Sequence, residues 1–183
     1  MKKLMLLAVM MLTSIMMSAQ NAVGQITLKP MAGVNFATMS KIKETEMRIG
    51  AVVGAEGEYG LTKKISATAG LLYSMQGAKC YGFSYNLDYI NVPILLNYYI
   101  YPGLAIKAGM QPALNISSNI ERTDLDYNAN SFYFSFPVGA SYEYSNFVID
   151  ARYNYGVTTI FSPGDSRHSW FSITLGYKFA LEL

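Results

Sequence analysis

Apolar and polar residues alternate with a period of two along most of the chain beyond residue 25, and no stretch there keeps a helical period. Such alternation is typical of β-strands that have two different faces. It predicts an all-β protein of eight strands, over Ile26–Thr38, Met47–Tyr59, Ile65–Gln76, Leu87–Tyr99, Leu104–Ser117, Phe132–Tyr144, Phe147–Gly156 and Ser169–Leu183.

The connections between these segments alternate in length. "GLTKK", "IYPG" and "SN" are short, whereas "MSKIKETE", "GAKCYGFSYN", "SNIERTDLDYNANS" and "VTTIFSPGDSRH" are long. This alternation predicts an antiparallel up-and-down meander with tight turns at one end and long loops at the other. We expect the last strand, in "SWFSITLGYKFALEL", to pair antiparallel with the first, "ITLKPMAGVNFAT", because a sheet in a membrane cannot keep an open edge.

Alternation alone fits either a soluble sheet or a membrane barrel, which bury opposite faces. The segments reach the roughly ten residues that a tilted strand needs to cross a bilayer. Charges fall within the polar register and hardly at all in the apolar one. These features predict a closed, eight-stranded, antiparallel up-and-down transmembrane β-barrel with an interior filled by side chains. The alternative is a soluble periplasmic, lipocalin-like barrel that binds a hydrophobic ligand, in which the apolar register faces inward.

Aromatic residues make up 14% of the chain and gather toward the strand ends. We interpret them as two interfacial girdles. The girdle at the short-turn end would hold Tyr59, Tyr99, Tyr101, Tyr144, Phe147, Tyr177 and Phe179, and the one at the loop end Tyr73, Phe132, Tyr155 and Trp170.

Eight charged residues of the polar register are candidates for one interior network: Arg48, Glu56, Glu58, Lys107, Glu143, Asp150, Arg152 and Lys178. Paired ions that plug the barrel are one interpretation, because buried charges need partners. A polar conduit or a proton-linked site is the other. Glycines in the same register would leave room for these long side chains. Pro93, Pro112 and Pro137 interrupt three strands, and we infer local bulges near them, at positions that the sequence does not locate.

The first residues predict a signal peptide, with Lys2 and Lys3 before the apolar run "LMLLAVMMLTSIMM". We expect cleavage after Ala19, or as late as Gly24, so that residues 20–183 form the barrel domain. Charged residues are only 14% of the chain, against about 25% in soluble domains. The net charge of +2 gives no reason to expect a nucleic-acid partner.

Few residues suggest chemistry. His168 lies near Asp165 and Ser166, but a polar turn explains "PGDSRHSW" better than a catalytic site. The acids Glu121, Asp124 and Asp126 lack the spacing of a calcium loop. Cys80 has no partner cysteine. We therefore expect no catalytic, cofactor or metal site.

The stretch "LDYINVPILLNYY", followed by a tight turn and "LAIKAGMQPALNIS", resembles the PorT-like outer-membrane β-barrel proteins of Gram-negative bacteria. The closing "LGYKFAL" is also similar to that family's last strand. The resemblance implies an exported barrel in the outer membrane, inserted by the barrel assembly machinery into outer-membrane lipid. Together with the pattern it predicts a non-enzymatic protein whose long outward loops bind a protein partner or serve the envelope surface. A small channel, a transport protein or a secretion accessory protein is the further alternative.

Overall fold

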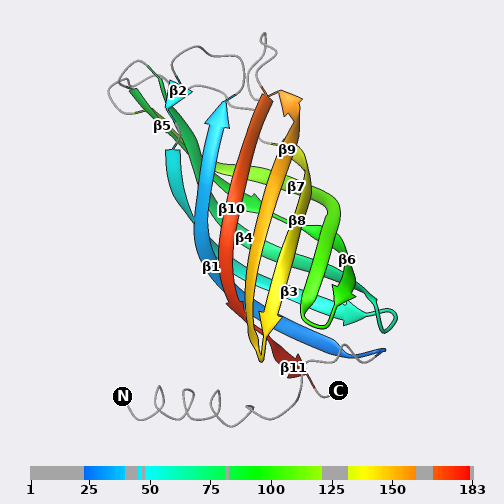
Figure 1. Cartoon of the computed structure of the whole chain (residues 1–183). Helices are drawn as coiled ribbons and strands as arrows, with labels where there is room; N and C mark the ends of the chain where they lie inside the picture. Colours follow the sequence, from blue (N-terminus) through cyan, green and yellow to red (C-terminus); the bar gives the residue numbers. More distant parts are fainter. Residues whose placement is uncertain are drawn as a thin grey trace, which may run out of the picture.

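The computed structural model describes residues 23–39, 45–46, 48–80, 83–120, 132–159 and 167–181. These residues form a closed antiparallel barrel of eight spans (Figure 1), as predicted. Within them, no helix is long and apolar enough to cross a membrane. The single-strand spans are β1 (Ile26–Met39), β3 (Arg48–Gly60), β4 (Ile65–Cys80), β7 (Leu104–Ile120), β8 (Phe132–Tyr144) and β9 (Phe147–Thr159). The two divided spans are β5 with β6 (Phe83–Asn91, Ile94–Tyr101) and β10 with β11 (Arg167–Tyr177, Phe179–Leu181), and the two-residue β2 (Thr45–Glu46) pairs with β4.

The barrel is closed by the first and last spans, as expected from the sequence. β1 pairs with β10 from Met31↔Gly176 to Met39↔His168, and β11 continues the same register with Ile26↔Leu181. In Figure 1 the blue β1 and the red β10 run side by side, and β11 lies at the short-turn end.

The two registers face opposite environments. In the span formed by β5 and β6, Ile94 and Leu96 are exposed on the outer wall, whereas Asn91 and Asn97 are buried inside. The apolar register therefore covers the outside of the barrel, and the polar register fills it. This is the arrangement of a barrel that faces lipid.

Most predicted girdle residues lie on the outer wall, but two do not. Tyr99 and Trp170 point into the barrel, where Trp170 is 2% exposed and the Tyr99 hydroxyl donates to Glu58. Both share the register of inward polar neighbours, Asn97 and Ser172. The alternation of inward and outward side chains along a strand therefore decides which way these two residues face, and their position near a strand end does not.

The prediction that the three prolines cause bulges is wrong, because the register does not shift at any of them. Pro93 separates β5 from β6, yet the pairs Leu72↔Asn91 and Ala69↔Ile94 keep one register. The ladders also continue without a shift through Pro112↔Phe134 and Pro137↔Asn154. A proline removes only one N–H donor, so a ladder can omit that bond without inserting a residue. Register shifts occur instead at Asp88/Tyr89, Tyr99/Tyr101 and Arg167/Ser169.

A fourth proline explains the break in the closing span. Pro30 on β1 lies opposite the junction of β10 and β11, where the register is the same on both sides. The turn between β8 and β9 holds this junction, because the Lys178 N–H donates to the Asn146 carbonyl at 2.8 Å. The Asn146 side-chain amide in turn donates to the Lys178 carbonyl at 2.9 Å.

At the loop end the sheet continues beyond the predicted strand bounds (Figure 1, upper left). β4 and β5 stay paired as far as Cys80↔Phe83, so most of the long connection "GAKCYGFSYN" is strand. β7 follows β5 to Tyr85↔Ile120, and β2 adds Thr45↔Cys80. We call these pairs of β2, β4, β5 and β7, beyond Gln76 on β4, the rim extension.

Deleting residues 179–183 should abolish the folded barrel. The deletion removes β11, so that backbone groups of β1 would lose partners in a membrane, at a cost of several kcal/mol each. We expect the truncated chain, refolded into lipid vesicles, to lose the heat-dependent mobility shift of a folded barrel on gels. Because the double variant Phe179→Ala/Leu181→Ala keeps the backbone pairs, it should retain the shift. A shifted band from the truncated chain would contradict the closure argument.

Candidate functional site in the barrel interior

Five charged side chains meet at the middle of the barrel, and we call them the central ion cluster. Its members come from four spans, β1, β3, β7 and β9, and are all buried: Lys29, Glu56, Lys107, Asp150 and Arg152. The Lys29 Nζ lies 2.9 Å from a Glu56 carboxylate oxygen and 3.6 Å from one of Asp150. The Lys107 Nζ lies 2.7 Å from Asp150.

Arg152 is the centre of this cluster. Its guanidinium donates through Nη1 and Nη2 to the Glu56 carboxylate, the latter at 2.8 Å. It donates through Nε at 2.6 Å and Nη2 at 2.8 Å to Asp150. The planar fork of an arginine suits such two-pronged contacts, which are among the strongest hydrogen bonds in proteins. One side chain thus links β9 to β3 across the barrel.

A second group, the lower ion cluster, lies nearer the short-turn end and consists of Glu58, Glu143 and Lys178. The Lys178 Nζ lies 2.6 Å from Glu143 and 3.2 Å from Glu58. Ser66 and Tyr99 donate to Glu58, each at 2.6 Å. Because Lys178 sits at the junction of β10 and β11, this cluster attaches the closing span to β3 and β8.

The two clusters neutralise each other. The central cluster has three cations and two anions, and the lower cluster has one cation and two anions. Together they hold four charges of each sign in a narrow, buried space. Because each charge contacts at least one opposite charge, the arrangement meets the requirement for burying ions and fills the lumen.

Glycines make the space that these side chains occupy. Gly70 lies opposite Glu56 in the β3–β4 ladder, and Gly139 lies opposite Arg152 in the β8–β9 ladder. A Cβ on Gly70 would lie 2.6 Å from the Glu56 Cγ, and one on Gly176 would lie 2.8 Å from the Lys29 Cγ. The inward glycines therefore serve packing, as the sequence suggested.

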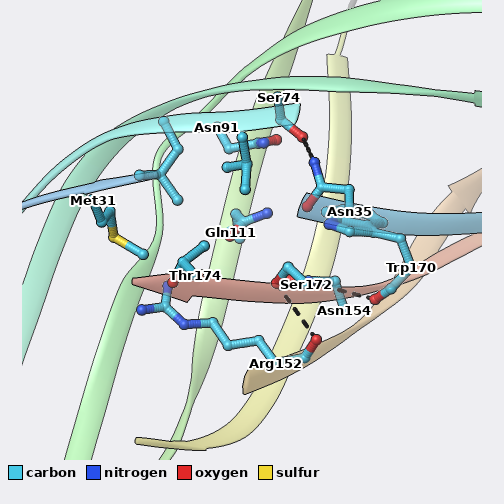
Figure 2. A pocket seen from close by; sticks show the side chains of 12 residues that line it. Met31, Asn35, Ser74, Asn91, Gln111, Arg152, Asn154, Trp170, Ser172 and Thr174 are labelled. Atoms are coloured by element: carbon cyan, nitrogen blue, oxygen red, sulfur yellow. Dashed lines mark hydrogen bonds between the residues drawn. The ribbon is translucent and has the colours of Figure 1, made fainter. Parts of the chain in front are cut away.

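Toward the loop end, the interior changes from charged to amide-rich (Figure 2). A small cavity, which we call the chamber, is lined by Met31, Asn35, Val52, Leu72, Ser74, Asn91, Gln111, Arg152, Asn154, Trp170, Ser172 and Thr174. Arg152 belongs to both the chamber and the central ion cluster. The Asn35 amide donates to the Ser74 hydroxyl at 2.7 Å.

Three aromatic rings, the aromatic roof, lie inside the barrel on the loop side of the chamber. They are Tyr89, Tyr133 and Trp170, all at most 3% exposed. The Tyr133 ring is 6.0 Å from Tyr89 and 5.9 Å from Trp170, between ring centroids. The interior thus has a fixed order from the short-turn end: lower ion cluster, central ion cluster, chamber and aromatic roof.

Seven of the eight charged residues named from the sequence lie in these two clusters. The side chain of the eighth, Arg48, is outside the described part. Lys29 was missed, although it shares the register of the buried Thr27 and Asn35. The chamber asparagines were missed as a group, since only the barrel's curvature brings their strands together. The side chains of His168, Asp165, Ser166, Glu121, Asp124, Asp126 and Cys80 lie outside the described residues.

An outer wall of apolar side chains, a closed antiparallel ladder and a charged interior define an integral membrane β-barrel. The chain belongs to the outer membrane protein beta-barrel domain family, whose model matches residues 18–162. This membership supports a location in the outer membrane. No curated protein matches the chain significantly.

Solved structures of outer-membrane barrels share this fold. Neisserial surface protein A (NspA) superposes with a TM-score of 0.58 at 16% identity, over 84% of this chain and 97% of that one. Ail, the attachment invasion locus protein of Yersinia pestis, gives a TM-score of 0.52 at 12% identity, over 86% of this chain and 100% of that one. At these identities the likeness concerns the fold alone.

Replacing Arg152 with methionine should destabilise the barrel by about 3–5 kcal/mol, because Glu56 and Asp150 would lose their main partner while staying buried. Equilibrium urea unfolding in lipid vesicles measures this loss. The control is Lys64→Met, on an exposed turn, which should change the free energy of unfolding little. Equal stability of both variants would show that the central cluster is not held by Arg152.

Replacing Gly70 with alanine should cost about 1–3 kcal/mol, because its Cβ would press on Glu56 and on the Ala55 carbonyl, 2.7 Å away. Gly57→Ala is the matched control on the neighbouring strand, since its nearest contact would be 3.8 Å. The same unfolding measurement should separate the two variants. An unaffected Gly70→Ala protein would argue against the packing role of the inward glycines.

Proposed function

We propose that this protein is a non-enzymatic outer-membrane barrel with a sealed interior, and that it acts through its loop end by binding a protein partner at the cell surface. This proposal rests on the contrast between the interior of the barrel and its loop end. Paired ions fill the lumen, whereas the rim extension and the strand ends that flank the long connections lie together at one end of the barrel.

The sealed interior makes a channel the weaker alternative. Four cations and four anions pair across the barrel. Arg152, for example, links β9 to β3. An ion entering this layer would have to displace contacts of 2.6 to 2.9 Å between buried charges.

A lipocalin-like role is also weaker, because it requires an apolar interior. Ile94, Leu96 and Leu175 are about half exposed on the outer wall, while the interior holds lysine, arginine and carboxylates. The chamber has mostly polar lining residues and room for about one water, so it does not fit a hydrophobic ligand. In a membrane the same outer residues face lipid, which accounts for their exposure.

The rim extension supports a binding role. β4, β5 and β7 continue as a paired sheet beyond the start of β8, which first meets β7 at Leu114↔Phe132. A paired sheet offers a partner a more rigid surface than a single loop does, and exposed functional residues commonly sit on connections above a rigid scaffold.

The route to the membrane follows from the first residues. We infer that residues 1–19, or up to residue 24, are removed as a signal peptide and that the barrel assembly machinery inserts residues 20–183. The end of the barrel that bears the rim extension then faces outward. Within the outer-membrane barrels, the narrower PorT-like resemblance favours an envelope accessory role, in which the barrel itself does no chemistry.

Two measurements test this function. The purified barrel in planar bilayers should show no stable unit conductance. A photo-crosslinking residue at position 119, in the rim extension, should form protein adducts in intact cells, whereas one at position 63, in a short turn, should not. Large, stable channels would overturn the sealed interior. Adducts equal at both positions, or absent from position 119, would overturn the binding role of the loop end.

A further inference from the structure

Four buried oxygen atoms around the chamber accept no hydrogen bond from the described residues. They are Asn35 Oδ1, Asn91 Oδ1, Asn154 Oδ1 and Thr174 Oγ1. Their residues are between 1% and 5% exposed, and all four line the same cavity. A buried acceptor without a donor costs about 1–3 kcal/mol, so four around one cavity point to a ligand that supplies donors.

The charge around the chamber restricts the chemistry of this ligand. The Arg152 guanidinium borders the cavity, and the central ion cluster holds three cations against two anions. This excess of positive charge disfavours a cationic ligand. An anion is disfavoured because three of the four unpaired atoms are amide oxygens, which can only accept hydrogen bonds. The ligand should therefore be neutral and carry at least two hydrogen-bond donors.

The size of the chamber restricts it further. The space open to the centre of a water-sized molecule is about 10 Å³. That is roughly the space that one water needs, provided that two to four polar groups surround it. Figure 2 shows Asn35, Asn91, Asn154 and Thr174 arranged around the shared space.

We propose that the chamber is a binding site for a single internal water molecule, which donates to two of the four unpaired oxygens. Arg152 of the central ion cluster and Trp170 of the aromatic roof both line the chamber, and the rings of Tyr133 and Tyr89 follow Trp170 on the loop side. We expect the roof to slow the exchange of this water, so its residence should be long compared with that of surface water.

Water-to-protein magnetisation transfer by NMR, on the whole barrel in lipid nanodiscs with labelled asparagine side chains, tests the proposal. The wild type should show long-lived water beside Asn91 and Asn154. The double variant Asn154→Leu/Thr174→Val removes two acceptors and should lose at least four-fifths of that signal. Thr27→Val is the control, because Thr27 also has an unpaired buried oxygen but does not line the chamber. It should leave the signal unchanged.

The aromatic roof gives a second, independent reading. Tyr133→Ala removes the central ring of the roof while all four oxygens remain, and should shorten the water residence time at least tenfold. A heat-dependent mobility shift establishes that each variant is folded before it is measured. A wild-type barrel without long-lived water at Asn91 and Asn154 would overturn the proposal. So would a signal that survives in the folded double variant, or a residence time unaffected by Tyr133→Ala.

Discussion

In the hydrocarbon of a bilayer, a backbone N–H or C=O must find its partner within the protein, because the solvent offers none. The pairing of β1 with β10 and β11 meets this requirement by removing the last sheet edge. The prolines show how strictly it is met. At Pro30 and Pro93 the ladder keeps its register, and at the junction of β10 and β11 both backbone groups of Lys178 find partners in Asn146. A shift of one residue would have turned every following side chain to the wrong face.

Closure of eight strands leaves a narrow interior, and that narrowness governs what the polar register can do. Glycines opposite some of the long charged side chains leave room for them, as Gly70 does beside Glu56 and Gly139 beside Arg152. Once inside, they must pair, since an unpaired ion in such a space is very costly. Arg152 satisfies two carboxylates at once and so joins distant strands. The same packing that stabilises the barrel fills its lumen, and this filling is the basis for proposing that the protein acts through its loop end.

The layers of the interior make the two ends of the barrel unequal. Ions lie toward the short-turn end, where Lys178 also secures the closing junction. Amides and hydroxyls follow, with space for one water, and aromatic rings cover them. The ion clusters hold together the part of the barrel where β10 and β11 close the sheet, and this part must stay fully paired in lipid. The amide layer lies between the ions and the aromatic roof, on the loop side of the barrel.

The sequence by itself determined the fold, the facing of the two registers and most members of the ion clusters. A period of two is a local property, visible wherever Phe171, Ile173 and Leu175 alternate with polar residues. It did not determine that Lys29 joins Glu56 and Asp150, that Tyr99 and Trp170 turn inward, or that Asn35, Asn91 and Asn154 surround one cavity. The rim extension and the unshifted prolines also needed the three-dimensional structure. Register, strand tilt and curvature decide which residues of distant strands meet, and these are set by all eight spans together.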